Sequence, residues 1–125
     1  MVVRIPVALA DDGSLLCIGE VPEQAMLALL RAPTSDTEGC IERIAESLAE
    51  KRDAGQGRDL LAFYCAGRRM HLGDAARSEL STLQARTGAL VMGGALSLGE
   101  IGSTSAWGYP MFHNAALVCT LWRHA

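Results

Sequence analysis

The sequence lacks the features that mark several large classes of protein. No apolar run approaches the ~18–20 residues that span a bilayer, and the first residues show no basic region followed by a long apolar stretch. Basic tracts are missing too, and the formal net charge of −3 argues against nucleic-acid binding. We therefore expect a cytoplasmic protein with no membrane span and no nucleic-acid partner.

The cysteines lack the spacing of a metal or redox motif. They stand at Cys17, Cys40, Cys65 and Cys119, with no Cys-x-x-Cys pair among them. Isolated cysteines in apolar surroundings are typical of buried, reduced thiols in an intracellular protein. We therefore expect reduced thiols and no metal site.

Catalytic and cofactor motifs are also missing. Ser97 stands in the segment Gly94–Gly99, which does not have the Gly-x-Ser-x-Gly pattern of a nucleophile elbow. The chain has neither a phosphate loop nor a dinucleotide fingerprint. His71 and His113 are the candidate haem ligands, and neither stands in a cluster of ligating residues. We expect no enzyme activity and no cofactor, with haem on one of these histidines as an alternative.

What the chain does have is an unusually apolar composition for its length. Half of its 125 residues are hydrophobic, 20% are charged, and the mean hydropathy is +0.19. This length suits one domain with its own core, so we expect a single domain over residues 1–125. The apolar excess indicates a surface that is buried against another domain or subunit.

The first part of the chain predicts three strands. Val2–Leu9 and Ser14–Val21 flank Asp11-Asp12-Gly13, a hairpin signal because aspartate and glycine tolerate positive φ. Ala25–Arg31 has residues that favour helix by propensity, but its short length and the preceding hairpin favour a third strand.

The rest of the chain alternates helices and strands. A capping box at Ser35–Glu38 opens a helix from about Asp36 to Arg52 with apolar residues at helical spacing. A second helix begins at Asp74 and stops at Gly88. Strands are expected at Leu60–Cys65, covered on both faces, at the glycine-rich Ala89–Leu98, and at His113–Trp122. The order βββ-α-β-α-β-β predicts an α+β fold, with a mostly antiparallel mixed sheet of about six strands and two helices.

Two strand ends carry the most specific signal. Phe63–Arg69 and Gly93–Gly102 are apolar runs that end in small residues followed by a charge. If the two strands share a sheet, their ends bring Cys65, Arg68 and Glu100 to one small polar site. The arginine suits a ligand carboxylate and the glutamate suits an amino group, which together match a free amino acid. A salt bridge between Arg68 and Glu100 explains the same residues without a ligand.

These segments resemble the C-terminal domain of the FIST family of bacterial and archaeal sensory proteins. That domain has a Phe-Ser-Cys-Ala-Gly-Arg-like strand end, then a helix, a Gly-Glu-Ile strand end, and an Asn before an apolar strand. The matching positions here are Phe63–Arg69, Gly94–Ile101 and Phe112–Asn114, with Val21–Glu23 as the early turn. Tyr64 departs from the family's serine, which makes the expected pocket less polar.

The resemblance implies a sensory domain that binds a small molecule, such as an amino acid, and has no catalysis of its own. Its partner would be an N-terminal FIST domain, a signalling effector domain or a second copy. The implied ligand-binding residues are Cys65, Gly67, Arg68, Gly99, Glu100, His113 and Asn114. Three alternatives stay open: a structural or interaction domain without a ligand, a haem-binding gas sensor, and an enzyme that uses Cys65.

Overall fold

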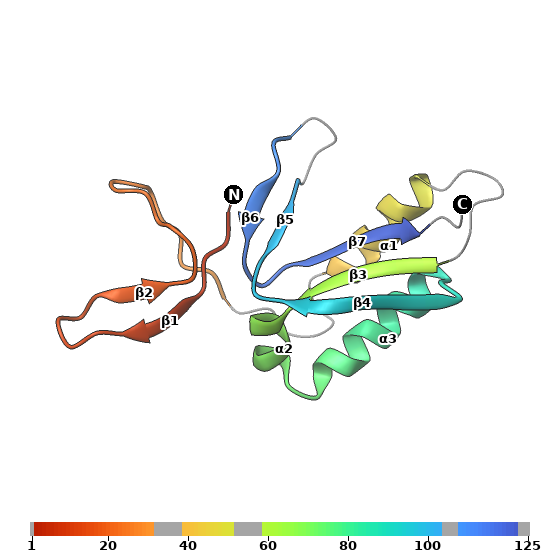
Figure 1. Cartoon of the computed structure of the whole chain (residues 1–125), viewed down its shortest axis with the longest axis horizontal. Coiled ribbons are helices and arrows are strands. Elements are labelled where there is room, and N and C mark those ends of the chain that lie inside the picture. Colours follow the sequence, from red (N-terminus) through yellow and green to blue (C-terminus); the bar gives the residue numbers. More distant parts are fainter. Residues whose placement is uncertain (1, 32–38, 52–58, 104–107, 123–125) are drawn as a thin grey trace.

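The computed structural model describes residues 2–31, 39–51, 59–103 and 108–122, and it has an α+β fold (Figure 1). The predicted fold class is therefore confirmed. The elements in chain order are β1 (Pro6–Leu9), β2 (Leu15–Cys17), α1 (Cys40–Glu50), β3 (Asp59–Cys65), α2 (Ala66–Leu72), α3 (Ala75–Thr87), β4 (Val91–Ser97), β5 (Glu100–Gly102), β6 (Met111–His113) and β7 (Leu117–Trp122). No helix within these ranges is long and apolar enough to cross a membrane.

The main sheet has three strands in the order β4-β3-β7. β3 runs parallel to β4, which places Cys65 beside Ser97, and antiparallel to β7. Successive residues of a strand point to opposite faces; Leu60 and Tyr64 are buried, whereas Phe63 is 41% exposed. The prediction that this central strand is covered on both faces is wrong, because the helices cover one face.

The core lies between that face and the helices α1 and α3. These helices pack against each other on the same side of the sheet (Figure 1). The core joins Ile41 and Leu48 of α1, Leu60 of β3 and Leu83 of α3. Burying each of these side chains contributes about 1.5–3 kcal/mol. The apolar stripe predicted for the first helix therefore faces the sheet.

The helix predicted over Asp36–Arg52 is shorter in the structure. α1 spans Cys40–Glu50 and its N-cap is Gly39, so it does not begin at the predicted capping box, and the residues of that box, Ser35–Glu38, lie outside the described ranges. α3 follows Asp74, whose side chain makes no capping hydrogen bond, and ends at Gly88 as predicted. Gly88 has a φ of 62°, a left-handed conformation that glycine adopts at little cost.

The predicted single sheet of about six strands is wrong. Besides the main sheet, the strands of the described residues form two separate pairs, β1 with β2 and β5 with β6. Ala25–Arg31, predicted as a strand, is not one, because a strand needs a paired neighbour and this exposed segment has none among the described strands. The strand predicted over His113–Trp122 is divided into β6 and β7 by a bend at Asn114 and Ala115.

A third helix, α2, follows β3 without a loop. Cys65 is its N-cap, so Gly67 and Arg68 lie in a helix and not in the loop that a strand end suggests. Small residues allow this sharp turn, because a Cβ on Gly67 would lie 3.1 Å from Cδ1 of Ile5. The turn directs Arg68 toward α3.

The glycines of β4 explain why that strand packs so closely. A Cβ on Gly94 would lie 1.7 Å from the carbonyl oxygen of Ala62 in β3, whereas a Cβ on Gly93 would have no neighbour within 4 Å. A glycine-rich strand suggests that a helix or a ligand packs closely against it. At Gly94 the close neighbour is instead the backbone of the adjacent strand β3.

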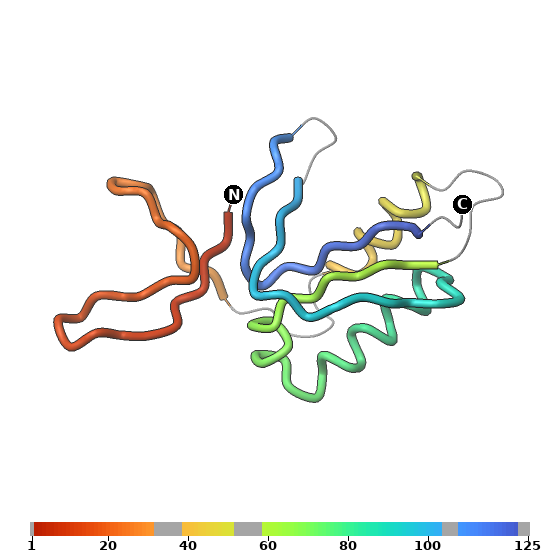
Figure 2. Tube along the Cα trace, viewed as in Figure 1, coloured from red at the N-terminus to blue at the C-terminus, as the bar shows by residue number. Residues whose placement is uncertain are grey.

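Residues 6–31, which we call the apolar arm, project from the rest of the molecule (Figure 2). The arm begins with the predicted hairpin: Gly13 has a φ of 85°, and the Ser14 N–H donates to Oδ1 of Asp12 at 2.9 Å. Its exposed large hydrophobic residues are Val7, Leu9, Leu15, Leu16, Val21, Met26, Leu27, Leu29 and Leu30. The arm thus exposes part of the apolar excess of the sequence, and other exposed apolar residues, among them Phe63, Val91 and Leu96, lie on the main sheet.

Arg4 connects the base of the arm to β6. Its Nη1 donates to the carbonyl oxygen of Phe112 at 2.8 Å, and its Nε donates to that of Glu20 at 3.0 Å. The guanidinium also lies 5.5 Å from the centre of the Phe112 ring, within the range of a cation–π contact. The arm is therefore anchored at a defined point.

Candidate functional site

Arg68 lies in a buried hydrogen-bond network that joins three elements. It is 8% exposed, and its Nε donates to Oε2 of Glu79 on α3 at 2.9 Å. Its Nη2 donates to Oε1 of the same carboxylate. Tyr64 of β3 donates its hydroxyl to Oε2 at 2.5 Å. The contact of Nε and Nη2 of Arg68 with the two oxygens of Glu79 is the paired geometry that a guanidinium group makes best with a carboxylate.

The network changes the proton affinities of its members. Burial acts to raise the pKa of the Glu79 carboxyl, but the hydrogen bonds from Arg68 and Tyr64 outweigh burial and hold that pKa below its ordinary value. Burial and the Glu79 carboxylate both raise the pKa of Tyr64. The hydrogen bonds to Glu79 raise the pKa of Arg68. The three groups therefore form an ion pair with a neutral tyrosine.

Glu100, the residue expected beside Arg68, has other partners. It is 3% exposed, at the start of β5, opposite His113 in β6. Its Oε1 accepts a hydrogen bond from Oγ of Ser97 at 2.6 Å, and its Oε2 has no partner among the described residues. The ion pair of Arg68 is with Glu79, so the alternative of a salt bridge to Glu100 is wrong.

The bend between β6 and β7 docks on the start of α2. The Ala115 N–H donates to Sγ of Cys65 at 3.3 Å, and the Ala115 carbonyl accepts from Nη1 of Arg68 at 3.4 Å. Ala115 has a φ of 56°, a left-handed conformation that costs a residue with a Cβ roughly 1–2 kcal/mol. Asn114 beside it is 2% exposed; its backbone N–H donates to the carbonyl oxygen of Val3 at 3.3 Å, whereas its side-chain amide atoms have no partners among the described residues. Cys65 and Arg68 thus hold a strained bend in place.

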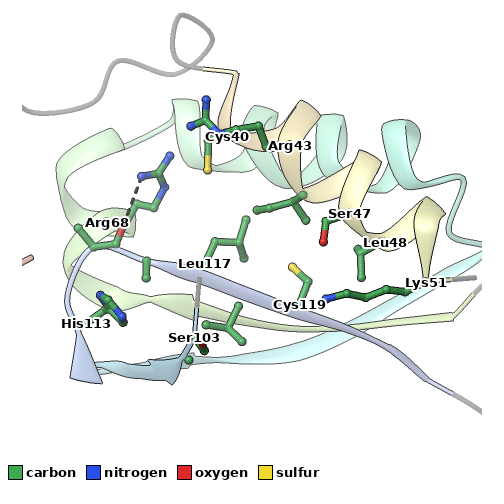
Figure 3. A pocket seen from close by; sticks show the side chains of 15 residues that line it. Cys40, Arg43, Ser47, Leu48, Lys51, Arg68, Ser103, His113, Leu117 and Cys119 are labelled. Atoms are coloured by element: carbon green, nitrogen blue, oxygen red, sulfur yellow. Dashed lines mark hydrogen bonds between the residues drawn. The ribbon is translucent and has the colours of Figure 1, made fainter. Parts of the chain in front are cut away.

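A cavity of about 520 Å³ lies between α1 and β7 (Figure 3). Arg68 and His113 lie at one end of it, and Lys51 extends toward Cys119 at the other. Sites for small organic ligands usually have volumes of roughly 300–1,000 Å³. The residues that line the cavity are Cys40, Arg43, Ile44, Ser47, Leu48, Lys51, Arg68, Gly102, Ser103, His113, Ala115, Ala116, Leu117, Val118 and Cys119.

The seven predicted site residues divide into two groups. Arg68 and His113 line the cavity. The other five are not among its lining residues: Cys65, Glu100 and Asn114 are buried side chains, and Gly67 and Gly99 sit at close contacts between elements. A Cβ on Gly99 would lie 2.2 Å from the ring of Phe112. The structure therefore connects Arg68 and His113 to the cavity, whereas Cys65 and Asn114 belong to the bend between β6 and β7.

The thiols of Cys40 and Cys119 belong to the cavity wall. Burial, reinforced by the nearby Cys40, raises the pKa of the Cys119 thiol to about 12, so that Cys119 is neutral at physiological pH. Cys65, the thiol singled out from the sequence, is 2% exposed and accepts a hydrogen bond from Ala115. The cavity thus presents Cys119 as a small neutral group.

The candidate haem ligands lie in different places. His113 lines the cavity, whereas His71 is exposed on α2. Within the described ranges, no group of three or more His, Cys, Asp and Glu residues could hold a metal ion.

Sequence reasoning missed Glu79, although a signal for it was present. Ala76, Glu79, Leu83 and Thr87 recur at helical spacing, and all four are buried. A carboxylate inside the apolar stripe of a helix needs a buried partner, because an unpaired charge is costly there. Helical spacing places Arg43 and Lys51 on the polar face of the first helix, so the sequence gives no sign that they line a cavity.

Comparisons with known proteins identify a family. The model of the FIST C domain matches residues 1–103, which end just after β5. No curated protein and no solved structure matches the chain significantly. Because the match covers most of the chain, and because the Cys65–Arg68 and Glu100–Ile101 segments on which the resemblance rests lie within it, the chain belongs to the FIST C domain family.

Proposed function

We propose that this chain is a small-molecule-binding sensory domain of the cytoplasm and that its ligand occupies the cavity between α1 and β7. The observation that carries the proposal is that Arg68 and His113, two residues of the predicted site, line a cavity of ligand size. Membership of the FIST C domain family supports a role in signal transduction. The domain would act by binding, without catalysis of its own.

The contacts around β6 suggest how binding would reach a partner. His113 lines the cavity, and its neighbour Phe112 contacts Arg4 at the base of the apolar arm. A ligand that shifts β6 would therefore act directly on the arm's anchor. The exposed apolar side chains of the arm supply a contact surface for an N-terminal FIST domain, an effector domain or a second copy.

A thermal-shift screen of amino acids and small carboxylates tests the proposal, since a ligand that binds only the folded state raises its melting temperature. Ser47→Phe places a ring in the cavity and should abolish every such shift. Ser78→Phe, at an exposed position of α3 away from the cavity, is the matched control. If no compound stabilises the wild type, or if Ser47→Phe responds as the wild type does, the proposal fails.

The presence of His113 in the cavity wall supports one alternative, a haem-binding sensor. Purified protein supplied with haemin would then show a Soret band that shifts or disappears in His113→Ala. His71→Ala, on the exposed surface of α2, should leave that band unchanged. A colourless wild-type protein would remove this alternative.

A further inference from the structure

We propose that the apolar arm of one chain packs on the open face of the main sheet in a second copy of this chain, and that the contact is reciprocal. The open face is the side of the sheet β4-β3-β7 that points away from α1 and α3. Its exposed residues are Phe63, Val91, Gly93, Ala95, Thr120 and Trp122. None of these six residues lines the cavity, so this inference and the proposed function can hold or fail separately.

The alternation of side chains along β3 shows which side of the sheet is open. Leu60 and Tyr64 are buried toward the helices, so Phe63 points to the other side, where it is 41% exposed. The strand register extends the same side to Ala95 in β4. Apart from Thr120, the exposed residues of this face are apolar or glycine. Parallel strands, such as β3 and β4, are usually covered on both faces, so an open apolar face calls for a partner.

The hairpin of the apolar arm has a side that suits this face. Leu9 and Leu15 stand directly opposite each other in β1 and β2, so both side chains project to one side of the hairpin. They are 70% and 60% exposed. The paired legs of the hairpin span about 10–13 Å, and the seven residues of β3 span about 23 Å. The hairpin therefore fits within the length of the sheet.

The centre of the open face has room for leucine side chains. A Cβ on Gly93 would meet no atom within 4 Å, and Ala95 adds only a methyl group to the same strand. Phe63, the residue paired with Ala95, places a larger side chain next to these small residues. Side chains of two β surfaces that pack face to face interdigitate in this way, large against small.

The exposed area of the chain is large enough for such an interface. It amounts to 9223 Å², whereas a compact monomer of 13.3 kDa exposes about 6,500 Å². The surplus of roughly 2,700 Å² exceeds the ~800 Å² that each partner buries in a stable complex. Each chain therefore has enough surplus surface to contribute one arm and one open face.

A second copy is the partner that covers both apolar surfaces at once. The arm projects away from the main sheet, so it does not cover the open face of its own chain (Figure 1). Reciprocal packing about a two-fold axis brings the arm and the open face of both chains into contact. A different protein would have to supply two matching apolar surfaces, one for the arm and one for the sheet.

Paired charge substitutions test whether these two surfaces meet. Leu9→Lys/Leu15→Lys on the arm and Phe63→Glu/Ala95→Glu on the open face each place charges inside the contact. Each variant alone should therefore dimerise at least about a hundredfold more weakly than the wild type in sedimentation equilibrium. An equimolar mixture of the two should form a heterodimer, because one of its contacts is unmodified and the other joins lysines to glutamates. Met70→Lys, on α2 and outside both surfaces, should dimerise as the wild type does.

A second measurement uses the wild-type chain and needs no substitution. Oxidation by hydroxyl radicals, read by mass spectrometry, should be suppressed at Leu9 and at Trp122 in the concentrated dimer. It should rise at both residues when dilution produces monomers. Tyr109 is 89% exposed and belongs to neither surface, so its oxidation should not depend on concentration.

Three results would overturn the inference. A wild-type chain that is monomeric at every concentration makes no such contact. A mixture of the two folded charge variants that stays monomeric shows that the arm does not meet the open face. If either variant fails to fold, the oxidation of the wild type decides, and suppression at Leu9 without suppression at Trp122 places the arm against another surface. Ligand-induced shifts of the melting temperature test the proposed function independently of all three.

Discussion

Arg68 on α2 and Glu79 on α3 form an ion pair that is shielded from water, and Tyr64 of β3 completes its hydrogen bonds. The pair joins two helices to the central strand at the place where the sequence suggests a ligand site. Nη1 of Arg68 also holds the carbonyl of Ala115. Arg68, a ligand-binding candidate by sequence, therefore connects four segments of the chain.

Removal of one partner of this pair should strongly destabilise the fold. Glu79→Gln leaves the guanidinium of Arg68 buried without a counter-charge, and the expected loss is about 3–5 kcal/mol of unfolding free energy in urea titrations. The double variant Arg68→Met/Glu79→Met removes both charges and should lose much less than the two single variants together. Additive losses in this cycle would contradict a coupled pair.

The pair should also make stability depend on acid. The pKa of Glu79 lies below its ordinary value of 4.5 in the folded state, so the stabilisation is present above about pH 4.5 and is lost as the pH falls through the lower folded value. The difference in unfolding free energy between wild type and Glu79→Gln should therefore narrow below pH 4.5. A constant difference from neutral pH to acid would show that the carboxylate is not stabilised in the fold.

Removal of the Ala115 Cβ should raise the free energy of unfolding. Ala115→Gly relieves a left-handed backbone, although glycine adds flexibility to the unfolded chain, so we expect a net gain of about 0.5–1 kcal/mol. Ala116→Gly makes the same change at a residue without a positive φ and should cost ~0.5–1 kcal/mol. Equal effects at the two positions, measured by thermal unfolding, would argue against strain at Ala115.

The two adjacent glycines of β4 should respond very differently to alanine. Gly94→Ala drives a methyl group into the carbonyl of Ala62 and should cost about 2–3 kcal/mol or more, since the backbone strands must separate. Gly93→Ala meets nothing within 4 Å and should change stability by no more than ~0.5 kcal/mol. Chemical denaturation of the two variants tests this prediction. If Gly94→Ala is as stable as the wild type, the pairing of β3 with β4 is wrong.

The apolar arm should make this chain self-associate. Leu9 is 70% exposed and Leu16 is 56% exposed, so the double variant Leu9→Lys/Leu16→Lys should sediment as a monomer under conditions in which the wild type forms larger species. Met70→Lys replaces an apolar side chain that is 83% exposed on α2 and should behave like the wild type. A wild-type chain that stays monomeric over a dilution series would show that the arm does not drive self-association.

The sequence predicted structure well where local residues alone determine a turn or a helix. The hairpin at Asp11–Gly13, the apolar stripe of α1 and the end of α3 at Gly88 all follow from turn chemistry or from helical spacing. It was less informative where pairing over a distance decides the outcome. The residues of Ala25–Arg31 do not reveal whether another strand will pair with them. Their propensity alone therefore could not exclude a strand.

The candidate site shows the same division. Local pattern pointed to Arg68 and the family resemblance to His113, and both line the cavity. The partner of Arg68 comes from a helix whose arrangement the local sequence does not specify. By helical spacing alone, Arg43 and Lys51 are solvated charges of an amphipathic helix. Only the position of β7 beside α1 turns that side of the helix into a cavity wall.

The pairing of β3 with β7 has a consequence for how the chain folds. The register joins Tyr64 to Leu117 and Asp59 to Trp122, so the middle strand is completed by a segment that leaves the ribosome well after it. Contacts between residues so far apart along the chain form slowly, because a long loop must close before they become favourable. During synthesis, one edge of β3 would stay unpaired until β7 has been made. The matched family region ends before β7, so a chain truncated at that boundary would lack the strand that closes this edge.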